Sequence, residues 1–376
     1  MRCEVPLAAP TGAKITAPGR PAPRKGRGAS VGVRIGLIGA GGIANGAHIP
    51  GYRSLGDQVE LVACADVNAS TARNTAAQHG IPGVYTDYQE MLAREHLDAV
   101  SVCTPNRYHA PAVIAALQAG CHVLCEKPPA MTADEARAME EAARSSGKLL
   151  TFGFMFRFSN EVRAARRYAE AGAFGEIYSG RVTAMRRRGI PGWGVFTNKE
   201  LQGGGPLIDI GVHMLDAALY VMGYPDPTTV TGVTHTKLGN RTPGVGLMGT
   251  WDPERYTVED ICNALIRFDN GASLLLESSF IANIEPTEEM NVRLFGTRAG
   301  CKLFPFSIFG EEHGVLTNTQ AAWFPGGGSH QREVEHFVRC VRGEAEPVST
   351  PAEAVKIQRI IEAIYRSADA GTSVQA

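Results

Sequence analysis

The glycine-rich stretch GGGPLIDIGVHMLD, residues 203–216, contains a carboxylate and an imidazole whose spacing would place them on one face of a helix. Asp209 and His213 are four residues apart, so a helix would place both side chains on the same face, with Asp216 close to it. Pro206 suits the start of that helix, because the N–H that proline lacks has no partner there. Such a pair can move a proton to or from a substrate. The alternative is a surface helix whose Asp and His are solvated or act as caps.

A second motif, in residues 33–44 (VRIGLIGAGGIA), has the spacing of a dinucleotide-binding turn. An apolar, β-branched run gives way to Gly39, Gly41 and Ala44, which fit the pattern G-x-G-x-x-A before a helix-compatible segment. The first glycine permits a tight turn, the second lets a pyrophosphate approach the backbone, and the alanine keeps the helix close to the strand. We therefore expect the cofactor to be held by Gly39, Gly41, Gly42, Ile43 and Ala44.

Asp66 follows the next predicted strand, residues 59–65. An acid at this place accepts hydrogen bonds from the adenosine ribose and repels a 2′-phosphate, so NAD is favoured as the cofactor. NADP stays an alternative. Asp66 could also serve as a helix N-cap, a role for which Asn68 and Ser70 compete.

Residues 33–156 alternate strands and helices in the order that a parallel, doubly wound sheet requires. Strands are expected at 98–103, 122–125 and 148–154, and a capped helix at 132–143. Ligands of such sheets bind at the carboxyl ends of the strands, where the sequence places Thr104, Asn106, Glu126 and Lys127.

Lys127 has a chemical and a structural interpretation. Beside an oxidised nicotinamide, like charge and partial desolvation would lower the pKa of a lysine, which could then hold or exchange a proton with a substrate hydroxyl. Pro128 and Pro129 stiffen the backbone from which this side chain emerges. The alternative is an exposed lysine at the start of a loop, the commonest environment of lysine.

Three motifs together resemble the Gfo/Idh/MocA family of oxidoreductases: the glycine turn at 39–44, Glu126-Lys127-Pro128, and the stretch 203–216. The similarity covers nearly everything after residue 32, including segments that contain His109 and Arg157. It implies an α/β fold with an N-terminal Rossmann domain, whose sheet is parallel and doubly wound. A C-terminal α/β domain would follow, built on an open, mainly antiparallel sheet, with the site between the two.

The resemblance also implies roles for individual residues. Lys127, Asp209 and His213 would meet the substrate as the catalytic group. His213 would take the proton of a hydroxyl whose carbon gives hydride to nicotinamide, while Lys127 binds the reacting oxygen and Asp209 holds a neighbouring hydroxyl or the imidazolium. Pro129 departs from the family pattern, which has Leu or Met there. The expected cofactor contacts beyond the glycine turn and Asp66 are Thr104, Asn106, His109, Glu126, Lys127 and Arg157.

Three regions of the chain are expected. Residues 1–32, rich in Pro, Gly and basic side chains, are predicted to be a disordered tail without a secretory signal. Residues 33–156 would bind NAD, and residues 157–376 would bind the substrate and form the oligomer. In the last region, the sequence predicts a strand at 177–185 and a hairpin of strands 261–268 and 272–280. An open sheet leaves one face uncovered, so a homodimer or homotetramer is expected.

Composition narrows the class of protein. The net charge of −1 in 376 residues gives no basic surface for nucleic acid, and no apolar run of spanning length is apparent, so no membrane partner is expected. The eight cysteines are scattered, and Cys121 and Cys125 have no second ligand pair, so we predict no metal site. Reduced cysteines favour the cytoplasm.

The substrate is expected to be a sugar, a sugar derivative or a cyclitol. Trp193 could stack on a sugar face, and Arg186 or Arg188 could meet an anionic group, although packing and solvation explain such residues equally well. Besides an NAD-dependent dehydrogenase, two hypotheses remain: an enzyme that cleaves glycosides by transient oxidation, and a non-catalytic dinucleotide-binding sensor.

Overall fold

The computed structural model of the chain describes residues 32–241 and 244–376, and Gly32–Ala376 form one compact unit. The predicted disordered tail, residues 1–32, lies outside the described residues except for Gly32.

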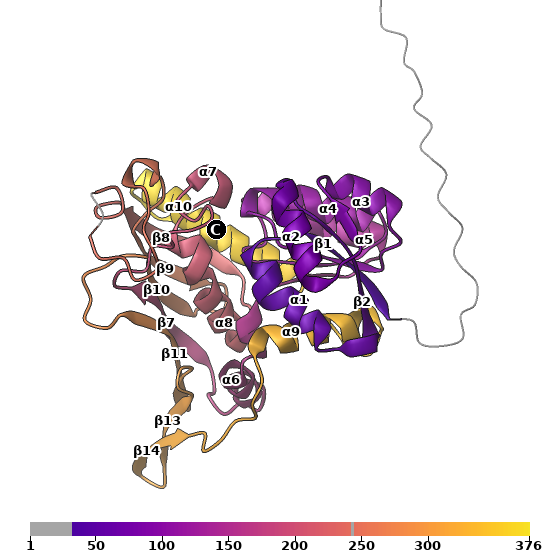
Figure 1. Cartoon of the computed structure of the whole chain (residues 1–376). Coiled ribbons are helices and arrows are strands. Elements are labelled where there is room, and N and C mark those ends of the chain that lie inside the picture. The colour runs from indigo at the N-terminus through magenta and orange to yellow at the C-terminus, as the bar shows by residue number, and fades with distance from the viewer. Residues whose placement is uncertain (1–31, 242–243) are drawn as a thin grey trace, which may run out of the picture. The chain divides into compact units, whose positions relative to one another are not determined.

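The first half of the compact unit, coloured indigo to purple in Figure 1, is built on a parallel sheet. The sheet has six strands, in the order β3-β2-β1-β4-β5-β6. This is the predicted doubly wound arrangement. Its strands are β1 (Val33–Ile38), β2 (Val59–Ala65), β3 (Gly83–Tyr85), β4 (Ala99–Val102), β5 (His122–Cys125) and β6 (Leu150–Phe152). Its helices are α1 (Ile49–Arg53), α2 (Ala69–His79), α3 (Tyr88–Arg94), α4 (His109–Gln118) and α5 (Ala133–Ser146).

Buried apolar strands explain why this sheet forms. Every residue of β4 is buried, as a central strand covered by helices on both faces requires. The predicted helix at 132–143 is α5, and the hydroxyl of Thr132 caps it by accepting a hydrogen bond from Glu135 N.

The second sheet has nine strands in the order β14-β13-β12-β11-β7-β10-β9-β8-β15. It is mainly antiparallel, with one parallel pair, β7 and β10. The predicted hairpin is present, with Ser273 opposite Arg267 and Ser279 opposite Ile261. The strands are β7 (Ile177–Arg186), β8 (Pro227–His235), β9 (Ile261–Phe268), β10 (Ser273–Ser279), β11 (Glu288–Gly296), β12 (Ala299–Lys302), β13 (Ser307–Glu312), β14 (Val315–Gln320) and β15 (Val374–Gln375).

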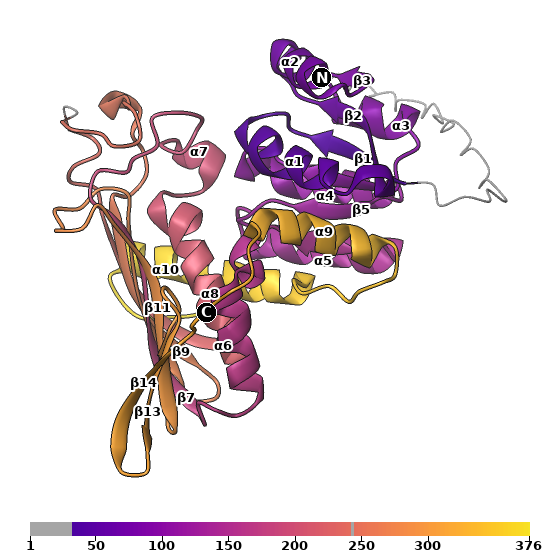
Figure 2. The same ribbon diagram turned by 60° about the horizontal axis from the view of Figure 1, so that its bottom comes forward.

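Helices pack on one face of this second sheet. α8 (Val212–Met222) lies on β7 and β11, α10 (Pro351–Ala370) lies on β8, and α6 (Asn160–Glu170) packs on α8. Figure 2 shows these helices on the side of the sheet that faces the first half of the unit, and no described helix on its other side. α9 (Ser329–Val341) returns to pack on α1, and α10 also packs on α5. Because C-terminal helices pack on both halves, the division at residues 156 and 157 stays a prediction.

One stretch, Lys199–Met222, is long and apolar enough to span a membrane by composition, contrary to our reading of the sequence. It contains 24 residues, and 78% of its most apolar window is buried inside the fold. Much of it is α8, whose apolar residues pack in the common core, so burial within the protein accounts for its hydropathy.

A buried arginine joins three helical segments where the two halves of the unit meet. Arg157, in the short helix η4 (Met155–Phe158), is 1% exposed. Its guanidinium donates to both Asp216 carboxylate oxygens, to Glu353 Oε2 at 2.8 Å, to the Val348 carbonyl at 2.6 Å and to the Tyr224 hydroxyl at 2.9 Å. These contacts tie η4 to α8 and α10. A buried charge without its partner is costly, so this network stabilises the junction.

Asp216→Asn should therefore destabilise the protein strongly, because it leaves the Arg157 charge buried and incompletely paired. We expect the free energy of unfolding to fall by about 3–5 kcal/mol in chemical denaturation. Glu60→Gln is the matched control, since Glu60 pairs with Arg34 at a half-exposed surface position. Equal losses in the two variants would contradict the assignment.

Candidate active site

The closest contact between the predicted catalytic residues is an ion pair. Lys127 follows β5, and its ammonium donates to Asp209 Oδ1 at 2.8 Å and to the Asp209 carbonyl at 3.1 Å. The two side chains are 17% and 16% exposed, so the pair is largely shielded but reachable. It connects the carboxyl edge of the first sheet to the segment that leads into α8.

That segment starts at Pro206, as predicted, since Pro206 already has helical backbone angles. Leu207–Gly211 then form a π-helical turn, η5, before α8 starts, which the sequence does not predict. Glu259 supplies the cap that the local sequence lacks: its carboxylate accepts hydrogen bonds from Gly205 N at 2.9 Å and Leu207 N at 3.3 Å. π-helical turns inside helices are often found at functional sites.

The triple glycine allows this cap to form. A Cβ atom at Gly204 would lie 1.9 Å from the hydroxyl oxygen of Tyr365, and that hydroxyl donates to Glu259 Oε1 at 2.9 Å. We did not predict Glu259 and Tyr365 as site-forming residues. No local signal marks them, because each is far along the chain from the turn it stabilises.

His213 lies in α8, with its ring edge-on to Phe156 at 5.4 Å between centroids. Its Nδ1 atom is buried and has no hydrogen-bond partner among the described residues. Burial, reinforced by the positive charge of Lys127, holds the pKa of His213 well below its usual value. The imidazole is therefore neutral at neutral pH and able to accept a proton.

Glu126 belongs to a buried polar chain beside the same edge. Its Oε1 lies 2.8 Å from His48 Nε2, and its Oε2 accepts a hydrogen bond from Lys127 N at 3.1 Å. His48 Nδ1 lies 3.0 Å from Ser101 Oγ, which in turn lies 2.7 Å from the Tyr52 hydroxyl. Glu126 is one of the predicted cofactor contacts, whereas His48, four residues after the glycine turn, is not among the predicted site residues.

The partners of Glu126 keep it ionised. Burial alone would raise its pKa, but the hydrogen bond and charge of His48, followed by the charge of Lys127, outweigh burial and hold the pKa at about 2. Burial alone would lower the pKa of His48, but the neighbouring Cys103 and Glu126 raise it instead. Glu126 and His48 are thus a buried ion pair at the strand ends.

The glycine turn fits the phosphates of a dinucleotide. Gly39 has φ of +92°, and a Cβ atom there would lie 2.6 Å from the Cys103 carbonyl oxygen, so only glycine suits this turn. Gly41 and Gly42 face open space, since a Cβ atom at either would meet nothing within 4 Å. Ile43 and Ala44 continue into the following helical turns, with Ala44 fully buried.

Asp66 lies at the position expected for a ribose-binding acid. Its Oδ2 accepts from Ala40 N at 3.0 Å and its Oδ1 from Asn68 N at 2.9 Å, which leaves lone pairs for a ribose hydroxyl. Asn68, not Asp66, caps α2, because its side chain accepts from Ser70 N and Thr71 N. The alternative role of Asp66 as that cap is therefore wrong.

Four other predicted cofactor contacts differ in whether their polar atoms already have hydrogen-bond partners in the protein. Thr104 Oγ1 is buried without a partner among the described residues, so it is available to a ligand. Asn106 donates to the Gln202 carbonyl at 2.8 Å and so joins the strand end to α7 (Lys199–Gln202). His109 is fully buried, with its nitrogens 2.8 Å from Pro128 O and 2.9 Å from Thr104 O. The polar atoms of His109 and Arg157 thus have protein partners, and direct contact of either residue with the cofactor stays a prediction.

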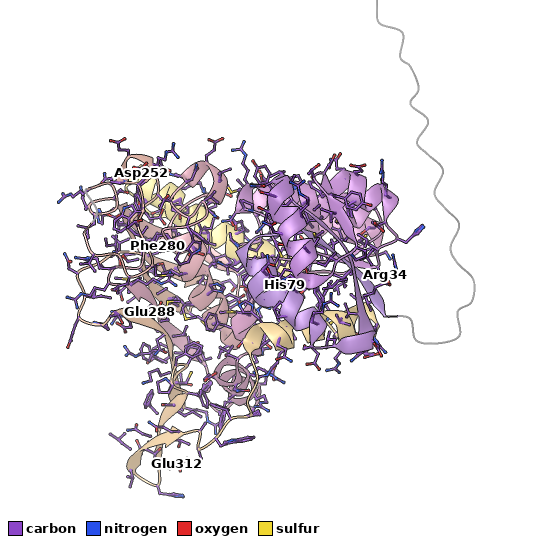
Figure 3. The ribbon with its side chains drawn as sticks, in the orientation of Figure 1. Arg34, His79, Asp252, Phe280, Glu288 and Glu312 are labelled. Carbon is purple, nitrogen blue, oxygen red and sulfur yellow. The ribbon has the colours of Figure 1, made fainter. Side chains whose placement is uncertain are left out.

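The three predicted substrate residues also differ. Arg186 donates a hydrogen bond at 2.9 Å to Oε1 of Glu288, which is labelled on the second sheet in Figure 3. The charge of Arg186 contributes to lowering the pKa of His213. Arg188 is bonded to the Asn283 side chain at 2.6 Å. Trp193 is 56% exposed, with its ring edge-on to Phe196. Of the three, the structure links only Arg186 electrostatically to His213.

Comparison with known proteins agrees with this geometry. Residues 33–154 match the family described as "Oxidoreductase family, NAD-binding Rossmann fold", and residues 162–302 match the "GFO/IDH/MocA C-terminal domain". D-glucoside 3-dehydrogenase of Escherichia coli K12 is 43% identical over 91% of this chain and 97% of its own length. D-xylose 1-dehydrogenase (NADP(+)) 2 of Haloferax volcanii is 30% identical over 91% and 99%.

A solved structure supports the same assignment. The aldose-aldose oxidoreductase of Caulobacter crescentus, in a complex with glycerol, superposes with a TM-score of 0.76 at 26% identity, over 92% of this chain and all of that one. The matches together span both sheets and all three motifs. The chain therefore belongs to the Gfo/Idh/MocA family of oxidoreductases, with NAD as the cofactor of its Rossmann fold.

Proposed function

We propose that this protein oxidises a secondary hydroxyl of a glycoside or related sugar by hydride transfer to NAD. The observation that carries the proposal is the 2.8 Å ion pair of Lys127 and Asp209, in the electrostatic range of a neutral His213 whose Nδ1 has no protein partner among the described residues. The similarity to a D-glucoside 3-dehydrogenase supports the substrate class and favours carbon 3 as the position oxidised.

Bound NAD supplies the hydride acceptor, and the residues of the chain supply positioning and proton transfer. The glycine turn, Gly39 to Ala44, would hold the pyrophosphate, Asp66 the ribose, and Thr104 and Glu126 the strand-end side of the cofactor site. His213 takes the hydroxyl proton as the carbonyl forms. Lys127 donates a hydrogen bond to the reacting oxygen, and Asp209 fixes the Lys127 ammonium.

A panel of glucosides, free sugars and inositols incubated with NAD tests this function. We expect NADH to form in proportion to a keto product, fastest with glucosides, as measured by absorbance of the reduced cofactor. Aglycone release without net NADH would instead identify a redox-assisted glycoside-cleaving enzyme. No turnover of any compound, with NAD binding intact, would favour the non-catalytic sensor.

Substitution of the proposed base should separate chemistry from cofactor binding. His213→Ala and Lys127→Ala should each lower kcat by about 10²-fold or more while the Kd for NAD is retained, because both groups act on the substrate hydroxyl. His96→Ala, at an exposed position, is the control. Normal kcat in His213→Ala would remove it from the mechanism.

Cofactor preference follows from Asp66. We expect tighter binding of NADH than of NADPH in fluorescence titrations, since the carboxylate repels a 2′-phosphate. Asp66→Ala should narrow that difference, whereas Asp57→Asn, at an exposed site, should leave it unchanged. A wild-type preference for NADPH would show that Asp66 does not select the cofactor.

We also propose that the chain is a homodimer or homotetramer that associates through the uncovered face of the second sheet. Tyr178, Val233, Leu275 and Phe295 are 43–54% exposed on its strands, an unusual set of apolar side chains for a solvated surface. Light scattering should give a multiple of 40.1 kDa, and Leu275→Glu should shift the mass toward one chain. A wild-type mass of one chain at micromolar concentration would contradict association.

A cytoplasmic location is part of the proposal. The seven cysteines in the described residues are free thiols, six of them buried, which suits a reducing compartment.

A further inference from the structure

Helix α9 brings an unassigned carboxyl group to the active-site edge. The helix packs on α1, on η4 and on the turn η1 (Ala44–His48) that follows the glycine motif. Glu333 in α9 is 2% exposed, and neither of its carboxylate oxygens has a hydrogen-bond partner among the described residues. A buried carboxyl without partners is costly and calls for a functional explanation.

His330, three residues earlier in the helix, is placed to exchange a proton with Glu333. Its Nδ1 lies 3.6 Å from Glu333 Oε2, is itself buried, and lacks a hydrogen-bond partner among the described residues. About a third of the side chain is exposed, so the ring reaches from the buried carboxyl to solvent. Helix α9 also packs on η4, and Phe156 of η4 lies edge-on to the His213 ring at 5.4 Å, so α9 reaches the element that contacts His213.

The groups around Glu333 on the neighbouring elements are few. Tyr52 comes from α1, His48 from η1 and Glu126 from the end of β5, and Arg157 of η4 is fully engaged with Asp216 and Glu353. His48 is likewise committed to Glu126. Burial, reinforced by the Glu126 charge and opposed by His330, raises the pKa of Glu333 to about 7. The carboxyl can therefore both hold and release a proton near neutral pH.

We propose that His330 and Glu333 take up the proton that His213 removes from the substrate. They would thus be a proton-accepting pair that acts after the base, His213. The inference rests on the proposed function. In the oxidation, the substrate O–H and C–H bonds break and a C=O bond forms. The hydride goes to NAD, and the proton passes from His213 to the Glu333 carboxylate and then through His330 to solvent.

The unpartnered atoms fit this proton path. His213 Nδ1, His330 Nδ1 and both Glu333 oxygens are buried polar atoms that the described residues leave without hydrogen bonds. Water molecules or substrate hydroxyls between them would satisfy these atoms and connect the two histidines. The partly exposed His330 ring gives the proton an exit to solvent.

Glu333→Gln tests the pair, because glutamine keeps the shape but cannot take up a proton. The ratio of wild-type to variant kcat should be near one at pH 5.5, where the wild-type carboxyl is protonated, and should rise to roughly 10-fold at pH 8.5. Glu335→Gln, two residues away on the exposed side of α9, is the matched control and should leave the ratio near one throughout. A loss in Glu333→Gln that is the same at every pH would indicate a structural role and overturn the proposal.

Difference infrared spectroscopy provides a measurement that needs no substrate. The wild-type protein with NADH should show a carboxylic-acid C=O band that titrates near pH 7 and is missing in Glu333→Gln but present in Glu335→Gln. Absence of that band would overturn the proposal even if glycosides are oxidised. If no glycoside is oxidised, the proposed function fails and the infrared titration decides whether Glu333 holds a proton.

Discussion

The contact of Lys127 with Asp209 is the constraint on which the rest of the site depends. It joins a loop at the carboxyl edge of a parallel sheet to a helical turn that begins 80 residues later, so neither half of the chain contains a complete site. The ammonium and the carboxylate are held at 2.8 Å in a shielded place, and this contact keeps its geometry only if the backbone on both sides is well positioned. The fold provides rigidity at both ends: Pro128 and Pro129 after the lysine, and the Glu259 cap before the aspartate.

Buried charge is the common means of fixing this junction. The ion pairs of Arg157 with Asp216 and Glu353, and of His48 with Glu126, each connect segments that are distant in sequence. Apolar packing alone tolerates small sliding movements, whereas a buried ion pair loses most of its stabilisation when its geometry changes. Such pairs therefore suit a site where two separately built sheets must present side chains to one substrate.

Local patterns explain what could be predicted from the sequence. Five strands of the first sheet, the β9–β10 hairpin and the Thr132 cap depend on neighbours within a few residues, and the sequence indicates them well, whereas the short strand β3 is not predicted. The π-helical turn at Leu207–Gly211 could not be predicted, because it depends on a cap from Glu259, some 50 residues away. The ion pair of Arg157 with Asp216 could not be predicted either, because the two residues are 59 positions apart in the sequence.

The burial of charged groups at the junction also sets which acids and bases are ionised and which are neutral. Glu126 is kept ionised by His48, whereas Glu333 has no committed cation and is neutral for part of the physiological pH range. His213 is kept neutral because it is buried beside the ammonium of Lys127. A positive charge near His213 would oppose a second one on the imidazole, so a proton that arrives there is driven to leave. A dehydrogenase needs that property, since each oxidation must release one proton before the base can act again.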